Sequence, residues 1–211
     1  MPESESKWLV LVPTEFELKF ISSDLEIPNS QVAVCGFGPV VAAARTMQLV
    51  GMHCPDRILL LGIAGSYDPA VGVGSACEFS KVACYGIGAG GGADFQTSGE
   101  MGWSQWPSQT PERTIGDQLP LQSLQQAGGQ LLTVCSAAGN QDEVASRREK
   151  FPGVFAEDME GFGVAAAGRL SGTPVSIVRG ISNLAGDRNK SNWEIGAALA
   201  AAVEYCHRAL G

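Results

Sequence analysis

Two short segments in the second half of the chain hold the residues that could do chemistry. The first contains Asp158 and Glu160, beside a third carboxylate at position 157, where the pattern predicts the start of a helix. The second is an apolar run that includes Arg179 and ends in Ser182 and Asn183. Buried charges are costly unless they are paired or in use. These residues therefore form either a structural ion pair or a site in which carboxylates stabilise positive charge beside an amide.

The spacing of apolar residues predicts the elements around these segments. Residues 162–170 are small and apolar, which predicts a helix packed closely against a sheet. Gly and Pro at 172–174 end that helix. Residues 174–183 then predict a strand buried on both faces, as in a parallel sheet. Open α/β sheets bind ligands beyond the carboxyl ends of their strands, so Arg179 and Asn183 lie where a site is expected.

Strands and helical segments alternate along the rest of the chain. We predict a single α/β domain over residues 1–211, with strands at 8–12, 31–35, 57–61, 76–85 (a pair) and 130–135 and with glycine turns at 36–39 and 62–66. Residues 1–6 are expected to form a flexible tail. Residues 86–129 are expected to form a long irregular insert. Its Phe95, Trp103 and Trp106 could contact a substrate or could belong to a loosely packed surface loop.

Composition limits the classes of function. The chain has 211 residues, of which 45% are hydrophobic and 17% charged, and a net charge of −8, which argues against nucleic acid as a partner. No apolar run reaches the length of a membrane span, and the acidic first residues are unlike a signal peptide, so we expect a cytoplasmic enzyme. The six cysteines show no metal-ligand spacing, so we expect reduced thiols, no metal and no cofactor.

Glu17 has two possible roles. Thr14 follows the first predicted strand and is a suitable N-cap, and Glu17 three residues later completes a capping-box pattern. The capping role could be its whole function. The second role, for which Glu15 is the alternative candidate, is implied only by the resemblance of the chain to a protein superfamily.

The segments Asp158-Met159-Glu160-Gly161 and Arg179-Gly180-Ile181-Ser182-Asn183 resemble the purine nucleoside phosphorylase and nucleosidase superfamily. The tail from Ser182 to Trp193 most resembles the futalosine hydrolases within it. The resemblance covers most of the chain apart from a variable insert at 86–129. It implies a three-layer fold with a central mixed, mostly parallel sheet flanked by helices. It also implies cleavage of the N-glycosidic bond of a small-molecule nucleoside, and a homo-oligomer, a dimer or larger.

The resemblance also implies roles for individual residues. Glu160 would accept hydrogen bonds from the ribose hydroxyls while Met159 packs against the sugar. Glu17 would take a proton from the attacking water. Arg179 would orient that water or keep Glu160 ionised, unless Glu160 and Arg179 are only a buried ion pair. The remaining expected substrate contacts lie beside these residues: Ile63, Ala64, Gly65, Asp158 and Ser182.

Three departures from the superfamily pattern refine the expected reaction. Residues 13–17 and 62–66 contain no arginine to hold phosphate, so water is the expected nucleophile. Residues 136–139 contain no aromatic side chain, so the group that stacks on the base is unassigned. Asn183 stands where adenine-specific nucleosidases have Asp, and an amide suits a 6-oxopurine such as hypoxanthine.

The leading hypothesis is therefore hydrolysis of futalosine to hypoxanthine and dehypoxanthine futalosine in menaquinone biosynthesis. A methylthioadenosine/S-adenosylhomocysteine nucleosidase or an aminofutalosine nucleosidase is the first alternative, and a phosphorylase follows. From another class, a non-catalytic nucleoside-binding relative would have the same fold.

Overall fold

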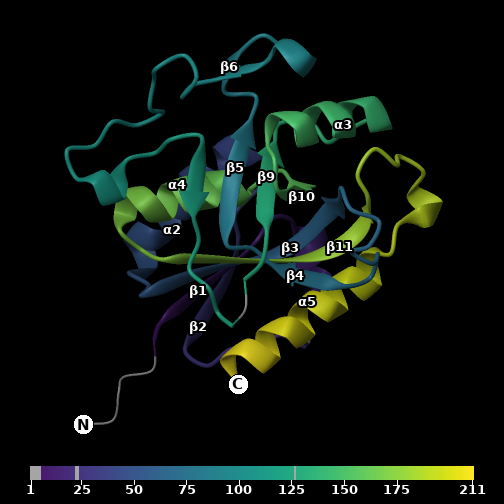
Figure 1. Cartoon of the computed structure of the whole chain (residues 1–211). Coiled ribbons are helices and arrows are strands. Elements are labelled where there is room, and N and C mark those ends of the chain that lie inside the picture. Colours follow the sequence, from purple (N-terminus) through teal and green to yellow (C-terminus); the bar gives the residue numbers. More distant parts are fainter. Residues whose placement is uncertain (1–5, 22–23, 126) are drawn as a thin grey trace.

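The computed structural model describes residues 6–21, 24–125 and 127–211 (Figure 1). Positions 1–5 of the expected tail lie outside this range. The helices are α1 (Glu15–Ile21), α2 (Pro39–His53), α3 (Gln141–Lys150), α4 (Gly161–Ser171) and α5 (Ile195–Leu210). The strands are β1 (Trp8–Val12), β2 (Ser30–Val34), β3 (Arg57–Ser66), β4 (Ala76–Glu78), β5 (Lys81–Tyr85), β6 (Gly88–Ala89), β7 (Gln96–Thr97), β8 (Gln118–Pro120), β9 (Gln130–Val134), β10 (Val154–Asp158) and β11 (Val175–Leu184).

The main sheet is mixed and mostly parallel. Its order is β2-β1-β3-β10-β9-β5-β8, and β11 pairs with the other edge of β3 and with β4. Pairs β1–β2, β1–β3, β3–β11, β9–β10 and β5–β9 are parallel. The long strand β3 brings β10 and β11 together. β11 pairs with it from Ile58 to Ser66, and β10 pairs with its last two residues.

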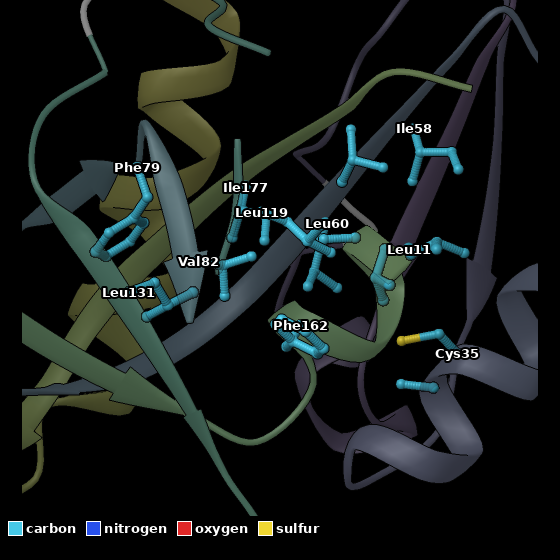
Figure 2. Packing of buried hydrophobic residues seen from close by; sticks show 14 of the residues in the cluster. Leu11, Cys35, Ile58, Leu60, Phe79, Val82, Leu119, Leu131, Phe162 and Ile177 are labelled. Atoms are coloured by element: carbon cyan, nitrogen blue, oxygen red, sulfur yellow. The ribbon is translucent and has the colours of Figure 1, made fainter. Parts of the chain in front are cut away.

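Helices cover both faces of the sheet, as strand β1 illustrates. Its side chains alternate between the two faces. Leu9 and Leu11 share a buried cluster with Phe162 of α4, and Figure 2 shows Leu11 and Phe162 in that cluster together with Leu60 of β3. Val10 belongs to the opposite cluster, which includes residues of α1 and α5. The predicted three-layer α/β fold is confirmed.

The small residues of α4 reflect close packing between helices. A Cβ atom at Gly163 would overlap the carbonyl oxygen of Pro39 at the start of α2. The sequence predicted a helix packed closely against a sheet, and the structure adds α2 as a second close neighbour.

Three local predictions were wrong. Residues 62–66 do not form a turn but continue strand β3, because β11 pairs with them along one edge and β10 pairs with Gly65 and Ser66 on the other. The carboxylates at 157 and 158 end β10, so only Glu160 is placed at the start of α4. The stretch 86–129 is not irregular throughout, since β6 pairs with β7 and β8 pairs with β5.

Two observations bear on the chemistry of the chain as a whole. All six cysteines are free, as the sequence predicted. Among the described residues, no helix has both the length and the apolar character needed to cross a membrane.

Candidate active site

A cavity of about 350 Å³ lies where the central strands end. It is lined by residues that follow β1 and by the last residues of β3, β9, β10 and β11. Its size is in the range of small-molecule sites. Nine of the ten residues that the sequence singled out line it: Glu17, Ile63, Ala64, Gly65, Asp158, Met159, Glu160, Ser182 and Asn183.

Arg179 is the tenth, and it lies behind the cavity wall. Its side chain is fully buried. Nε and Nη2 donate to Oδ2 of Asp158 at 3.1 and 2.5 Å, and Nη2 also donates to Oε2 of Glu160 at 3.3 Å. Burial by itself lowers the pKa of Arg179, but the carboxylates of Asp158, Glu160 and Glu17 outweigh it and raise the pKa overall. Arg179 is therefore a fixed positive charge in a group of carboxylates.

The carboxylate of Asp158 is already hydrogen-bonded to other groups of the protein. Besides Arg179, its carboxylate accepts hydrogen bonds from the hydroxyl of Thr133 at 2.6 Å and from the backbone N–H of Gly161 at 2.9 Å. The side chain has no exposed surface. This geometry suits a residue that positions Arg179 and the start of α4 rather than one that releases these partners to bind a sugar.

Glu160 is held at both oxygens and reaches the cavity. Oε1 accepts from the backbone N–H of Gly38 at 3.0 Å, and Oε2 faces Arg179. Burial raises the pKa of Glu160 to about 7, with the charges of Asp158 and Glu17 adding to the rise and Arg179 opposing it. Glu160 is thus a carboxylate whose ionised form is costly here, and perturbed carboxylates in clefts are typical of functional sites.

The position of Glu17 is compatible with both roles that the sequence left open. Its backbone N–H donates to Oγ1 of Thr14 at 3.2 Å, and the Thr14 hydroxyl donates to Oε2 of Glu17 at 2.6 Å, so Thr14 does cap α1. Oε1 accepts from the N–H of Ile63 at 3.2 Å. The side chain is 5% exposed and lines the cavity, so capping fixes the carboxylate without removing it from the site.

Gly62 permits Glu17 and Arg179 to approach each other. A Cβ atom at position 62 would overlap Nη1 of Arg179 and would lie 2.8 Å from Oε1 of Glu17. Nη1 is buried and has no hydrogen-bond acceptor within the described part of the chain. A buried donor without a partner is rare in folded proteins and indicates a ligand or water site. The Nη1 atom of Arg179 therefore indicates such a site in the space between the side chains of Arg179 and Glu17.

Asn183 presents its amide to the cavity in one fixed orientation. Nδ2 donates to the carbonyl oxygen of Leu184 at 2.8 Å, and Oδ1 accepts from the Ser182 hydroxyl at 2.8 Å. The amide nitrogen must face Leu184, because an amide oxygen there would meet another acceptor. One N–H of Asn183 therefore stays free for a ligand.

Glu157 lines the cavity as well, and the sequence had given it no separate role. It pairs with Gly65 in the sheet, and Asn183 pairs with the same Gly65 on the opposite edge of β3. Its carboxylate accepts from Nη1 of Arg147 at 2.6 Å, the hydroxyl of Tyr67 at 2.6 Å and the N–H of Ala138 at 2.7 Å. A carboxylate has about four acceptor positions, so one is left.

Several further residues that the sequence did not single out line the same cavity. Five of them are aromatic or basic, namely Phe16, Phe37, Arg188, Lys190 and Trp193. Two signals could have found them: Phe16 and Phe37 closely follow the ends of β1 and β2, and the others belong to the tail after Asn183. Trp103 and Trp106 do not line this cavity, and Phe95 is buried against Tyr85.

Comparisons with known proteins show the family of the chain. Residues 17–210 match the Phosphorylase superfamily. The chain is 31% identical to the futalosine hydrolase of Streptomyces coelicolor over 80% of its length and 73% of that protein. It is 28% identical to the 5′-methylthioadenosine/S-adenosylhomocysteine nucleosidase of Bacillus pumilus over 75% of its length and 70% of that protein.

A solved structure gives the same result for the fold. The 5′-methylthioadenosine/S-adenosylhomocysteine nucleosidase of Colwellia psychrerythraea, in complex with adenine, superposes with a TM-score of 0.78 at 20% identity. The match covers 98% of this chain and 95% of that one. The expected superfamily and fold class are thus confirmed. The chain belongs to the phosphorylase superfamily, and its relatives named above are nucleosidases.

Proposed function

We propose that this nucleosidase hydrolyses the N-glycosidic bond of futalosine, releasing hypoxanthine and dehypoxanthine futalosine for menaquinone biosynthesis. The observation that supports this substrate best is the pair of side chains beside Gly65. Asn183 offers a free N–H from one neighbouring strand, and Glu157 offers a free acceptor position from the other.

This pair suits a 6-oxopurine better than adenine. Hypoxanthine has acceptors at N7 and O6, which the N–H of Asn183 could satisfy, and a donor at N1, which Glu157 could accept. Adenine has an acceptor at N1 and a donor at its 6-amino group, so a carboxylate near N1 would repel it. Unmatched buried polar groups cost about 1–3 kcal/mol each, which is enough to discriminate the two bases.

The ribose would lie on Glu160. Oε1 and Oε2 of Glu160 are held by Gly38 and Arg179, so the remaining acceptor positions face the cavity in a fixed geometry. The 2′- and 3′-hydroxyls would donate to this carboxylate, with Met159 in contact with the sugar. Cleavage passes through a cation-like ribosyl group, and fixed negative charge stabilises that positive charge as it develops.

The attacking water would lie between Glu17 and Arg179. Glu17 has acceptor capacity beyond its contacts with Thr14 and Ile63, so it could take the proton of the water. Nη1 of Arg179 has no acceptor among the described residues and lies on the same side of Gly62, so it could orient the water oxygen. Asn183 cannot transfer a proton but would donate a hydrogen bond to the departing base.

Water is favoured over phosphate as the nucleophile for an electrostatic reason. The residues around the proposed water position are the carboxylates Glu17, Glu160 and Asp158, and the guanidinium of Arg179 is already bound to two of them. A phosphate dianion placed there would face more negative than positive charge.

The proposal retains the expected homo-oligomer, a dimer or larger. Apolar side chains of α1, of the turn before α2 and of the start of α2 are exposed next to the cavity, including Phe16 at 54%, Phe37 at 64% and Val40 at 78%. A second copy of the chain would cover such a surface. Light scattering of the purified protein gives the mass directly.

The test of the function is a substrate panel. Purified protein is incubated with futalosine, aminofutalosine, methylthioadenosine and inosine, with and without phosphate, and the products are identified by chromatography. We expect hypoxanthine from futalosine at the same rate in both buffers. Preferential release of adenine would favour the adenine-nucleosidase alternative, and ribose 1-phosphate as product would identify a phosphorylase. If no base is released from any of the four substrates, the remaining hypothesis is a non-catalytic nucleoside-binding relative.

A further inference from the structure

The segment between β11 and α5 contributes the positive charge that lines the cavity directly. Arg188 and Lys190 both line it, and both side chains are exposed to solvent at its mouth (Figure 1 shows this loop beside α3). Neither forms an ion pair with a carboxylate of the described residues. Two cations at the opening of an otherwise acidic cavity attract an anionic group to that opening.

The segment is held in a defined shape by Asp187. Its carboxylate accepts from the N–H of Asn189 at 2.8 Å and from Nδ2 of Asn192 at 2.7 Å, and its carbonyl oxygen accepts from Nε1 of Trp193 at 3.1 Å. The guanidinium carbon of Arg188 lies 5.2 Å from the ring centre of Trp193, a cation–π distance. The basic residues therefore project from a structured loop.

The charges of the cavity are separated along its depth. Glu17, Glu157 and Glu160 are each at most 5% exposed, whereas Arg188 and Lys190 lie at the solvent end. An anion would be repelled by the inner carboxylates and attracted to the mouth. A nucleoside with an anionic substituent can enter only with its neutral base and ribose first.

We propose that Arg188, Lys190 and Trp193 form a subsite for an anionic aromatic substituent at the 5′ carbon of the nucleoside. Trp193 offers a flat apolar surface to the aromatic ring, and the two cations bind its carboxylate. The inference rests on the proposed function, since futalosine bears a carboxylated aromatic ring on its 5′ side. It adds that the enzyme recognises this carboxylate through the side chains of Arg188 and Lys190.

The test compares futalosine with its carboxamide, in which the carboxylate is replaced by a neutral group of the same shape. The wild-type enzyme should prefer futalosine in kcat/KM by about 10- to 100-fold, through a lower KM, as expected for charge-assisted hydrogen bonds. The double variant Arg188→Met/Lys190→Met should lose this preference. Raising the salt concentration should raise the KM for futalosine in the wild type and much less in the double variant.

Arg45→Met is the matched control, because Arg45 is an exposed residue of α2 outside the cavity and its preference should equal that of the wild type. If the wild type hydrolyses futalosine and its carboxamide equally well, the subsite is overturned while the proposed function stands. The same holds if the double variant keeps the wild-type preference. If futalosine is not hydrolysed but methylthioadenosine is, the proposed function fails, and the subsite fails with it.

Discussion

Nε and Nη2 of Arg179 both donate to a single oxygen of Asp158, and neither side chain has exposed surface. Asp158 thereby fixes the guanidinium so that Nη2 also reaches Glu160. Nη1 lies near Glu17 and has no partner in the part of the chain that the structure describes. One buried ion pair thus sets the position of a charge that serves two carboxylates of the cavity. The structural and the catalytic interpretations of this pair are therefore compatible.

Removing Arg179 should destabilise the protein as well as inactivate it. Arg179→Met leaves the buried carboxylates of Asp158 and Glu160 without their cation, and such a loss costs about 3–5 kcal/mol. Urea unfolding followed by circular dichroism measures the free energy of unfolding, with Arg45→Met as the control at an exposed position. A variant as stable as the wild type would contradict the arrangement described.

Glu17→Gln and Glu160→Gln should each lower kcat by at least about 100-fold, because each removes a positioned carboxylate that acts in the transition state. Both proteins should keep the wild-type circular dichroism spectrum. Glu15→Gln is the matched control, since Glu15 is exposed on the same helix and does not line the cavity. If Glu17→Gln retains full turnover, Glu17 is only a cap and Glu15 becomes the candidate base.

Activity and stability should respond to pH in opposite directions. Burial raises the pKa of Glu160 from 4.5 to about 7, so the folded protein holds this proton more tightly than the unfolded chain. The resulting stabilisation, on the order of 3 kcal/mol, is complete below pH 4.5 and is lost as the pH rises through 7. Sugar binding needs the carboxylate, so kcat/KM should rise over the same interval.

Two experiments check this pH dependence. A profile of kcat/KM from pH 5 to 9 should show an acid limb near pH 7, where the free enzyme loses the Glu160 proton. Urea unfolding at pH 5 and pH 8 should show a smaller difference in Glu160→Gln than in the wild type. An identical difference in both proteins would mean that Glu160 does not have the raised pKa.

Asn183→Asp should shift preference between bases. The substitution replaces the free N–H by a group that is normally an anion at neutral pH and that would repel O6 of hypoxanthine. A protonated carboxyl could instead donate to N7 of adenine while its other oxygen accepts from the 6-amino group. The mismatch is worth about 10- to 100-fold in kcat/KM. A variant with the wild-type ratio between 6-oxo and 6-amino substrates would show that Asn183 does not read the base.

The sequence predicted most of the elements because buried strands and tightly packed helices have clear local patterns. It failed at residues 62–66, where Gly62 and Gly65 indicate a turn. There, pairing with β11 along the whole segment and with β10 at Gly65 and Ser66 overrides the low strand propensity of glycine. The absent Cβ of Gly62 instead makes room for Arg179, a reason that becomes visible only when residues far apart in the sequence are brought together.

The sequence predicted which residues gather at the candidate site but not how deeply each side chain is buried. Residue types and the family resemblance together selected nine residues that line the cavity, and they also selected Arg179, which lies behind it. The depth of a side chain depends on long-range packing, which no local pattern encodes. The same is true of Glu157, whose partners Tyr67 and Arg147 come from distant segments.

The most direct test of the account is the ratio of kcat/KM for futalosine to that for aminofutalosine in phosphate-free buffer. These substrates share the ribose and the 5′ substituent and differ only at position 6 of the purine, with the accompanying change at N1. Base recognition by Asn183 and Glu157 predicts a ratio of about 10 or more. A ratio near or below one, or no hydrolysis without phosphate, would contradict the proposed function.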